Sequence, residues 1–215
     1  MHRIGLLGGT FDPVHNGHLK LGEKVLARYG LDKIVFIPAA HPPHKNGAVV
    51  GDVEHRLEML RLAIDEIHRF ELSRIEVSRD TASYTFDTIE QFKRDSGSRA
   101  LYHFIIGYDA LSEIETWYRW KDLLDTTNFI VAVRPGFSLK EIQQLLERNG
   151  FSPDKGNEER WIGEQYGNEV LFLSDEIADI SSTDIRFKIA ADQAWSDLVP
   201  PDVADYINHN HLYSS

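Results

Sequence analysis

The sequence predicts an α/β fold, in which a doubly wound, mainly parallel sheet carries helices on both faces of a single domain. Three observations support this expectation. Short apolar runs alternate with helical patterns along most of the chain, a glycine-rich loop directly follows the first of these runs, and 215 residues with 42% hydrophobic content suffice for one full core. The predicted strands are residues 3–7, 33–37, 70–77, 101–106, 128–133 and 170–173.

The first loop carries most of the functional information. Residues 8–18 read GGTFDPVHNGH and lie between the first predicted strand and a helix predicted from the apolar spacing of residues 19–26. Glycines let the backbone approach a ligand closely, and the free N–H groups at a helix start favour an anion. We expect Asn16 to be the N-cap, which places Gly17 and His18 in the first helical turn.

The glycine spacing does not fit the common phosphate-binding motifs. The glycines at Gly5, Gly8 and Gly9 do not form G-x-G-x-x-G, and no Gly-Lys-Ser/Thr follows them. Two imidazoles, His15 and His18, could instead donate hydrogen bonds to phosphate oxygens where charge develops. The alternative is that one histidine caps the helix while the other packs, and a zinc pair is disfavoured because the chain has neither HExxH nor cysteine.

Composition narrows the class of partner. The formal net charge is −11, and no basic cluster is long enough to indicate nucleic-acid binding. Cations for an anionic ligand must therefore be concentrated locally, and Lys45, Arg134 and Arg186 are the candidates. No cysteine is present, and no apolar stretch is long enough to cross a bilayer, so we expect a cytoplasmic protein without a membrane partner. The sequence leaves open whether the protein forms a homo-oligomer.

A second anion site is predicted near the carboxyl end of the chain. Ser181, Ser182 and Thr183 precede a helical pattern, and Arg186 follows one turn later. A plain N-cap would explain the hydroxyls alone, but an arginine in the same turn favours phosphate binding. Ligands of doubly wound sheets bind outside the carboxyl ends of the strands, where the loops at residues 38–51, 78–85, 107–117 and 174–182 are expected.

Other candidates have strong structural alternatives. Asp109, with Gly107, follows an apolar strand and could accept ribose hydroxyls, or it could simply cap a helix. The aromatic residues Trp117, Tyr118 and Trp120 are more typical of core than of a ligand platform. Lys45 lies in a loop stiffened by two prolines, although an exposed loop lysine is the commoner case, and His41 and His44 beside it are weaker candidates.

The remaining segments are predicted to be structural. A helix over residues 52–68 would bury one apolar face, and Ser138 with Glu141 forms a capping-box pattern ahead of another helix. Residues 152–168 are polar and are interpreted as a surface excursion with a turn near Trp161. Residues 181–215 form the C-terminal helical part of the domain, which spans residues 1–215.

The ordered set of motifs resembles one family of enzymes. The chain resembles the nucleotidyltransferases with a His-x-Gly-His loop and, within them, the bacterial nicotinate-nucleotide adenylyltransferases. Beyond the first loop, the resemblance rests on PPHK, SYTFDT, FIIGYD, Trp117 with Trp120, ISSTDIR and a terminal VPPDVADYI. It implies a Rossmann-like sheet and adenylyl transfer from ATP to nicotinate mononucleotide, with magnesium accompanying ATP and no metal site on the protein.

The resemblance also implies roles for individual residues. Catalysis would involve His15, His18, Lys45 and Arg186. ATP would be bound by Gly8, Gly9, Phe11, His15, His18, Gly107, Asp109, Ser181, Ser182, Thr183 and Arg186. Nicotinate mononucleotide would be bound by Gly9, Thr10, Lys45, Thr85, Trp117, Tyr118 and Arg134. Two alternatives stay open: a relative acting on nicotinamide mononucleotide or another phosphate acceptor, such as phosphopantetheine or glycerol phosphate, and a nucleotide sensor without catalysis.

Overall fold

A computed structural model describes residues 1–40, 51–79, 82–133, 138–175 and 178–214. Its strands are β1 His2–Gly9, β2 Lys33–Pro38, β3 Phe70–Leu72, β4 Ala100–Gly107, β5 Asn128–Ala132, β6 Phe151–Asp154, β7 Asn157–Gly163 and β8 Glu169–Leu173. Its helices are α1 Asn16–Tyr29, α2 Val53–Ile64, α3 Thr85–Ser96, α4 Tyr108–Ser112, α5 Trp120–Thr126, α6 Lys140–Arg148, α7 Ser182–Ala190 and α8 Pro201–His209. Short 3-10 turns cover Gly97–Arg99, Ile114–Thr116 and Ser196–Leu198.

The described strands form one sheet in the order β3-β2-β1-β4-β5-β8-β7-β6. Pairing is parallel from β3 through β8 and antiparallel for β8-β7 and β7-β6. This confirms the doubly wound, mainly parallel α/β fold. Because β1 is followed by β2 on one side and paired with β4 on the other, strand order reverses between β1 and β4, and ligands of such sheets bind at the carboxyl end of this switch point.

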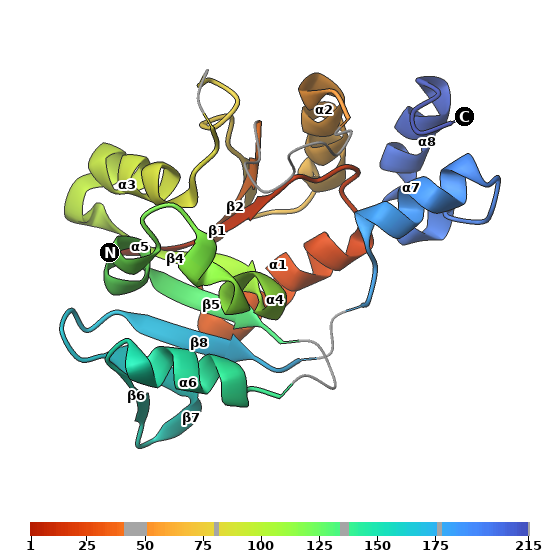
Figure 1. The fold of residues 1–215 in the computed structure, drawn as a ribbon. Coiled ribbons are helices and arrows are strands. Elements are labelled where there is room, and N and C mark those ends of the chain that lie inside the picture. Colours follow the sequence, from red (N-terminus) through yellow and green to blue (C-terminus); the bar gives the residue numbers. More distant parts are fainter. Residues whose placement is uncertain (41–50, 80–81, 134–137, 176–177, 215) are drawn as a thin grey trace.

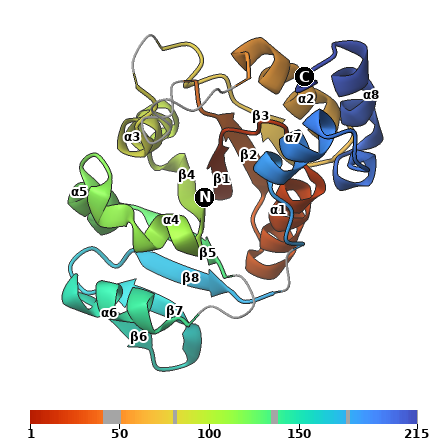
Figure 2. The same cartoon turned by 45° about the vertical axis from the view of Figure 1, so that its right-hand side comes forward.

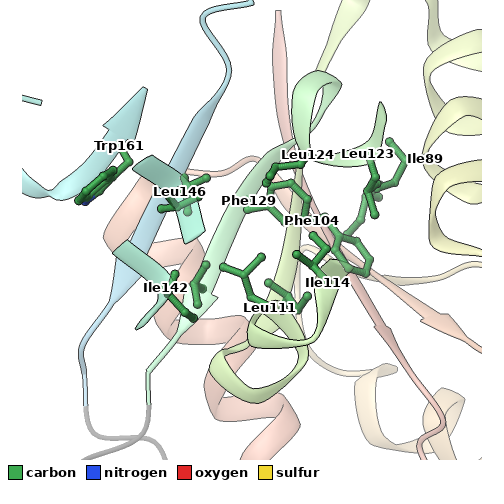
Figure 3. Packing of buried hydrophobic residues seen from close by; sticks show 14 of the residues in the cluster. Ile89, Phe104, Leu111, Ile114, Leu123, Leu124, Phe129, Ile142, Leu146 and Trp161 are labelled. Carbon is green, nitrogen blue, oxygen red and sulfur yellow. The ribbon is translucent and has the colours of Figure 1, made fainter. Parts of the chain in front are cut away.

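Helices cover both faces of the sheet (Figures 1 and 2). One buried cluster packs α3, α4, α5 and α6 on one face, and Figure 3 shows part of it around Phe104 and Phe129. A second buried cluster packs α1, α2, α7 and α8 on the other face. Alternate residues of a strand serve opposite faces, so Leu6 belongs to the first cluster and Leu7 to the second.

The third strand is shorter than its sequence predicts. Residues 70–77 alternate in a strand-like way, but β3 ends at Leu72, and the amide of Ser78 donates to the carbonyl of Arg74 at 2.9 Å in a turn. Glu76 is buried in this turn, where its Oε1 accepts a 2.8 Å hydrogen bond from the Thr88 hydroxyl of α3. The strand prediction is wrong after Leu72 because this tertiary contact outweighs local alternation.

Residues 152–168 are more regular than their polar composition suggests. They contain most of the antiparallel hairpin β6-β7, which extends the sheet beyond β8. The expected turn near Trp161 is wrong, because Trp161 lies within β7, only 3% exposed, and packs in the first core cluster. Glu159 of the same strand pairs with Arg28 of α1 at 2.8 Å, so the hairpin is tied to the opposite layer.

Two helix starts can be compared with their sequence signals. The helix predicted over residues 52–68 is present as α2, with Asp52 as its N-cap, although it ends at Ile64. The capping box expected at Ser138 is wrong: the N-cap of α6 is Leu139, and the Ser138 hydroxyl oxygen accepts from the amide of Lys140 at 3.3 Å. Ser138 therefore closes a short side-chain turn before the helix.

Candidate active site

The glycine loop connects β1 to α1, as the motif predicts. The structure moves the N-cap from Asn16 to His15, and Gly17 and His18 lie in the first helical turn. The amide of His15 donates to Nδ1 of His18 at 3.2 Å, while the amide of His18 donates to the carbonyl of His15 at 2.9 Å. The start of α1 is therefore capped by the histidine pair and not, as the sequence predicts, by the Asn16 side chain.

The two histidine rings form a packed unit. They stack with centroids 3.6 Å apart, and Phe11 meets His18 edge-on at 4.9 Å. Phe11 has a left-handed backbone with φ of 50° and a buried ring beneath Gly9, where an added Cβ would lie 3.0 Å from that ring. Any contact of Phe11 with a nucleotide must therefore come from its backbone.

His18 has a defined protonation state. Burial, with a smaller contribution from His15, holds the pKa of His18 well below the ordinary value, so the ring is neutral at pH 7. Because Nδ1 accepts a backbone hydrogen bond, the proton of the neutral ring must be on Nε2. His18 therefore offers a single N–H donor without a full positive charge.

The predicted second anion turn lies directly against the first loop. Ser181 is the N-cap of α7, and its hydroxyl accepts from the amide of Asp184 at 3.1 Å. The Ser182 hydroxyl donates to the carbonyl of Pro13 at 2.9 Å. Arg186 donates through Nη1 to the carbonyl of Asp12 at 2.7 Å, and the same nitrogen lies 3.8 Å from Oδ2 of Asp12. Two segments separated by about 170 positions thus form one contiguous wall.

A pocket of about 340 Å³ opens between these two segments. It lies at the carboxyl ends of β4 and β5, which contribute Gly107 and Ala132. At Gly17 an added Cβ would approach the His15 ring at 3.0 Å and the Ala178 carbonyl oxygen at 3.3 Å, so the glycine is needed for this close approach. The pocket is lined by His15, Gly17, His18, Leu21, Gly107, Ala132, Ala178, Ile180, Ser181, Ser182 and Thr183.

Some candidates lie near this pocket without lining it. Gly8 and Gly9 end β1, and Thr10 follows them with its carbonyl bound to Arg56. Asp109 is exposed in the first turn of α4, whose N-cap is Gly107, so the helix-capping alternative for Asp109 does not hold. An exposed carboxylate beside Gly107 stays available to a ligand that extends from the pocket.

The aromatic candidates form a second cluster with the start of α3. Thr85 is the first residue of α3, and the ring of Tyr84 before it lies 4.5 Å from the ring of Tyr118. Trp117 and Trp120 are half-buried and pack against the first core cluster, so both lie at the edge of the core rather than inside it. The fold therefore brings the SYTFDT segment next to the Trp117 segment.

Several predicted residues lie outside the described residues. These are Lys45 and Arg134, together with the weaker candidates His41 and His44.

Sequence reasoning missed two residues that organise the first loop. Asp12 is 2% exposed; its Oδ2 accepts from the amide of Gly51 at 3.1 Å, and its Oδ1 accepts from the hydroxyl of Tyr213 at 2.7 Å. Arg56 is buried and donates to the carbonyls of Thr10, Ala39 and Gly51 at 2.8–2.9 Å. The sequence holds a sign of the Arg56 role, because a charged residue at this position interrupts the apolar face of the helix that contains it.

No group of three or more His, Asp or Glu side chains is arranged to hold a metal ion in the ranges that the structure describes. The carboxylate of Asp12 is directed at Gly51 and Tyr213 rather than at the pocket. Magnesium in phosphate-transfer sites is usually held by substrate phosphates, water and one or two carboxylates, a mode that needs no such group.

Comparison with known proteins defines the class first. The cytidylyltransferase-like family model matches residues 6–188, a range that contains the glycine loop, the pocket and Arg186. Curated relatives then define the family. A probable nicotinate-nucleotide adenylyltransferase of Thermoanaerobacter sp. (strain X514) is 39% identical over 98% of this chain and 94% of the relative, and one from Neisseria meningitidis serogroup C is 38% identical over 99% of each. The chain belongs to the nicotinate-nucleotide adenylyltransferase family.

Solved structures agree with this fold. Plasmodium falciparum nicotinic acid mononucleotide adenylyltransferase, complexed with APC, superimposes with a TM-score of 0.75 at 18% identity, over 99% of this chain and 98% of that protein. A second structure of the same enzyme is complexed with NaAD. At this level of identity the likeness supports the fold alone.

The helices of the described residues include none that is both long and apolar enough to span a bilayer.

Proposed function

We propose that this protein transfers the adenylyl group of ATP to the phosphate of nicotinate mononucleotide, giving nicotinate adenine dinucleotide and pyrophosphate in NAD biosynthesis. One observation carries the proposal: Ser182 and Arg186 donate hydrogen bonds to the first loop at Pro13 and Asp12, and the His15–His18 turn and residues Ser181–Thr183 line one pocket. Two anion-binding helix starts at one pocket suit a polyphosphate. The family membership narrows the acceptor to a nicotinate nucleotide.

The reaction needs no nucleophile from the protein. An oxygen of the mononucleotide phosphate attacks the α-phosphorus of ATP, a new P–O bond forms, and the bond to the bridging oxygen breaks with its electron pair leaving on pyrophosphate. The protein aligns two anions and stabilises developing charge. Magnesium bound by the triphosphate and water would neutralise charge on the β- and γ-phosphates.

The donor side of the site is assigned to the pocket. His15 and the Nε2–H of His18 contact oxygens of the α-phosphate and the bridging oxygen, where donors stabilise the transition state. Arg186 and Lys45 take the β- and γ-phosphates. Backbone groups of Gly8, Gly9 and Phe11 approach the nucleotide, Ser181, Ser182 and Thr183 hold phosphates at the α7 start, and Gly107 with Asp109 holds the ribose.

The acceptor side is assigned to the aromatic cluster. Thr10 and Gly9 hold the incoming phosphate with Lys45 and Arg134, Trp117 stacks on the pyridine ring, and the Thr85 hydroxyl with the Tyr118 amide receives the nicotinate carboxylate. The 4.5 Å contact between Tyr84 and Tyr118 supports this grouping, because it joins the two chain segments that the assignment requires. Cytoplasmic location and any homo-oligomer stay predictions.

The test is a rate comparison between acceptors. Purified protein is incubated with ATP, magnesium and either nicotinate mononucleotide or nicotinamide mononucleotide, and both pyrophosphate and dinucleotide are measured. We expect stoichiometric products and a higher kcat/KM for the acid. Faster turnover of the amide, of phosphopantetheine or of glycerol phosphate would replace the proposed acceptor, and ATP binding without pyrophosphate release would favour a nucleotide sensor.

A further inference from the structure

The C-terminal segment reaches back to the glycine loop. Beyond α8 the chain turns so that the hydroxyl of Tyr213 donates to Oδ1 of Asp12 at 2.7 Å, although 201 positions separate the two residues. Figures 1 and 2 show this end of the chain beside α8. Tyr213 has a left-handed backbone with φ of 62°, and it packs against the second core cluster. The segment is therefore held by tertiary contacts in a conformation that tyrosine seldom adopts by itself.

Asp12 links this segment to Arg186, which lies in α7 one turn beyond the pocket-lining residues Ser182 and Thr183 and does not itself line the pocket. Its Oδ1 is bound by Tyr213 and its Oδ2 by the amide of Gly51, while Arg186 donates to its main-chain carbonyl at 2.7 Å and lies 3.8 Å from its Oδ2. Arg186 thus contacts the carbonyl closely and the carboxylate only at longer range. Burial and the charge of Asp12 raise the pKa of Tyr213, so the hydroxyl stays a donor at neutral pH.

Loss of the tyrosine donor would leave Oδ1 of a buried carboxylate unsatisfied, and a nearby cation would be drawn toward it. Arg56 cannot respond easily, since its guanidinium is committed to three carbonyl oxygens. Arg186 can respond, because among the residues that the structure describes its one hydrogen bond besides that to Asp12 is a 3.4 Å bond to the Thr183 hydroxyl. A bidentate pair with Asp12 would then compete with phosphate for the same guanidinium.

We propose that Tyr213 is a positioning residue for adenylyl transfer, which acts through Asp12 to keep the Arg186 guanidinium available to the β- and γ-phosphates of ATP. The inference rests on the proposed function only in placing those phosphates at Arg186. It assigns a role in the donor site to a residue of the C-terminal segment.

The matched variants are Tyr213→Phe and Tyr206→Phe. Both remove one hydroxyl and keep the aromatic ring, but the hydroxyl of Tyr206 lies 2.9 Å from Nδ1 of His55, whereas that of Tyr213 donates to Asp12. For Tyr213→Phe we expect kcat/KM for ATP to fall about tenfold, the loss expected for one charge-assisted hydrogen bond, with an unchanged KM for nicotinate mononucleotide. The Tyr206→Phe variant should stay within about twofold of wild type for both substrates.

A binding measurement with inorganic pyrophosphate and magnesium separates this inference from the function itself. Calorimetry should show weaker pyrophosphate binding to Tyr213→Phe than to wild type or Tyr206→Phe, whether or not transfer to the chosen acceptor occurs. Equal pyrophosphate affinity in all three proteins would overturn the inference. So would equal losses for ATP and acceptor that follow a lowered melting temperature, because they would indicate a purely structural role. Absence of transfer in wild type with intact pyrophosphate binding would instead contradict the proposed function.

Discussion

Replacement of His18 by alanine separates catalysis from folding. The His18 ring also has structural contacts, because it stacks on His15, meets Phe11 edge-on and accepts the amide hydrogen of His15. Losing that hydrogen bond costs about 1 kcal/mol. Losing the ring contacts costs about 1–2 kcal/mol more.

A domain of this kind is stable by about 5–15 kcal/mol, so His18→Ala should remain at least about 95% folded at 25 °C. The catalytic loss should be much larger. One N–H donor aimed at developing negative charge is worth about 2.7–4 kcal/mol, or a 10²- to 10³-fold decrease in kcat. Unfolding therefore cannot account for the expected loss of turnover.

The assay is pyrophosphate release at saturating ATP and nicotinate mononucleotide, together with thermal unfolding followed by circular dichroism. His68→Ala is the control, since His68 is exposed beyond the end of α2. A folded His18→Ala protein with kcat within about threefold of wild type would remove His18 from the mechanism.

Three other perturbations follow from the geometry. Trp117→Ala should raise the KM for nicotinate mononucleotide about tenfold through lost stacking and leave the KM for ATP unchanged; steady-state kinetics with an unaltered acceptor KM would refute the stacking role. Arg56→Met should lower the free energy of unfolding by about 3–5 kcal/mol, because three partly buried carbonyls lose their donor, and a denaturant titration showing a loss below about 1 kcal/mol would contradict this. The pKa of Glu169 lies below its ordinary value of 4.5, chiefly because His103 hydrogen-bonds to it, so Glu169 contributes stability that is present above pH 4.5 and lost as pH falls through the lower folded-state pKa. Unfolding of Glu169→Gln should therefore depend less on pH in that acid range than unfolding of wild type, and parallel pH profiles would exclude the linkage.

Sequence periodicity predicts the sheet well where strands are buried on both faces. The cores of β1, β2, β4, β5 and β8 all lie within predicted runs, because a parallel strand covered by helices must be apolar throughout. The same reasoning overextends β3, since the burial of Glu76 depends on Thr88 of a distant helix. It also misses β7, where most residues are polar and Trp161 alone is fully buried among the larger side chains.

The two turns to which we assign phosphate binding could be predicted singly, because each has its hydroxyls, glycines or basic residue within a few positions. Their contact could not be derived from spacing, since Ser182 to Pro13 and Arg186 to Asp12 are long-range bonds. The N-cap of α1 was misplaced because one long-range and one local contact decide the helix start. Asn16 is the better capping residue by propensity, but its side chain instead donates to the carbonyl of Asp197 at 3.0 Å, and the histidine pair satisfies the helix start.

The two core clusters, one on each face of the sheet, support different parts of the site. The pocket is built mainly by α1 and α7, whose apolar sides belong to the second cluster, whereas Thr85 and Trp117 belong to segments supported by the first. On the proposed assignment, the ATP site packs on the second cluster and the nicotinate mononucleotide site on the first, and the two sites share the central sheet. Such an architecture permits acceptor preference to diversify by repacking one layer while the nucleotide-handling layer is inherited intact.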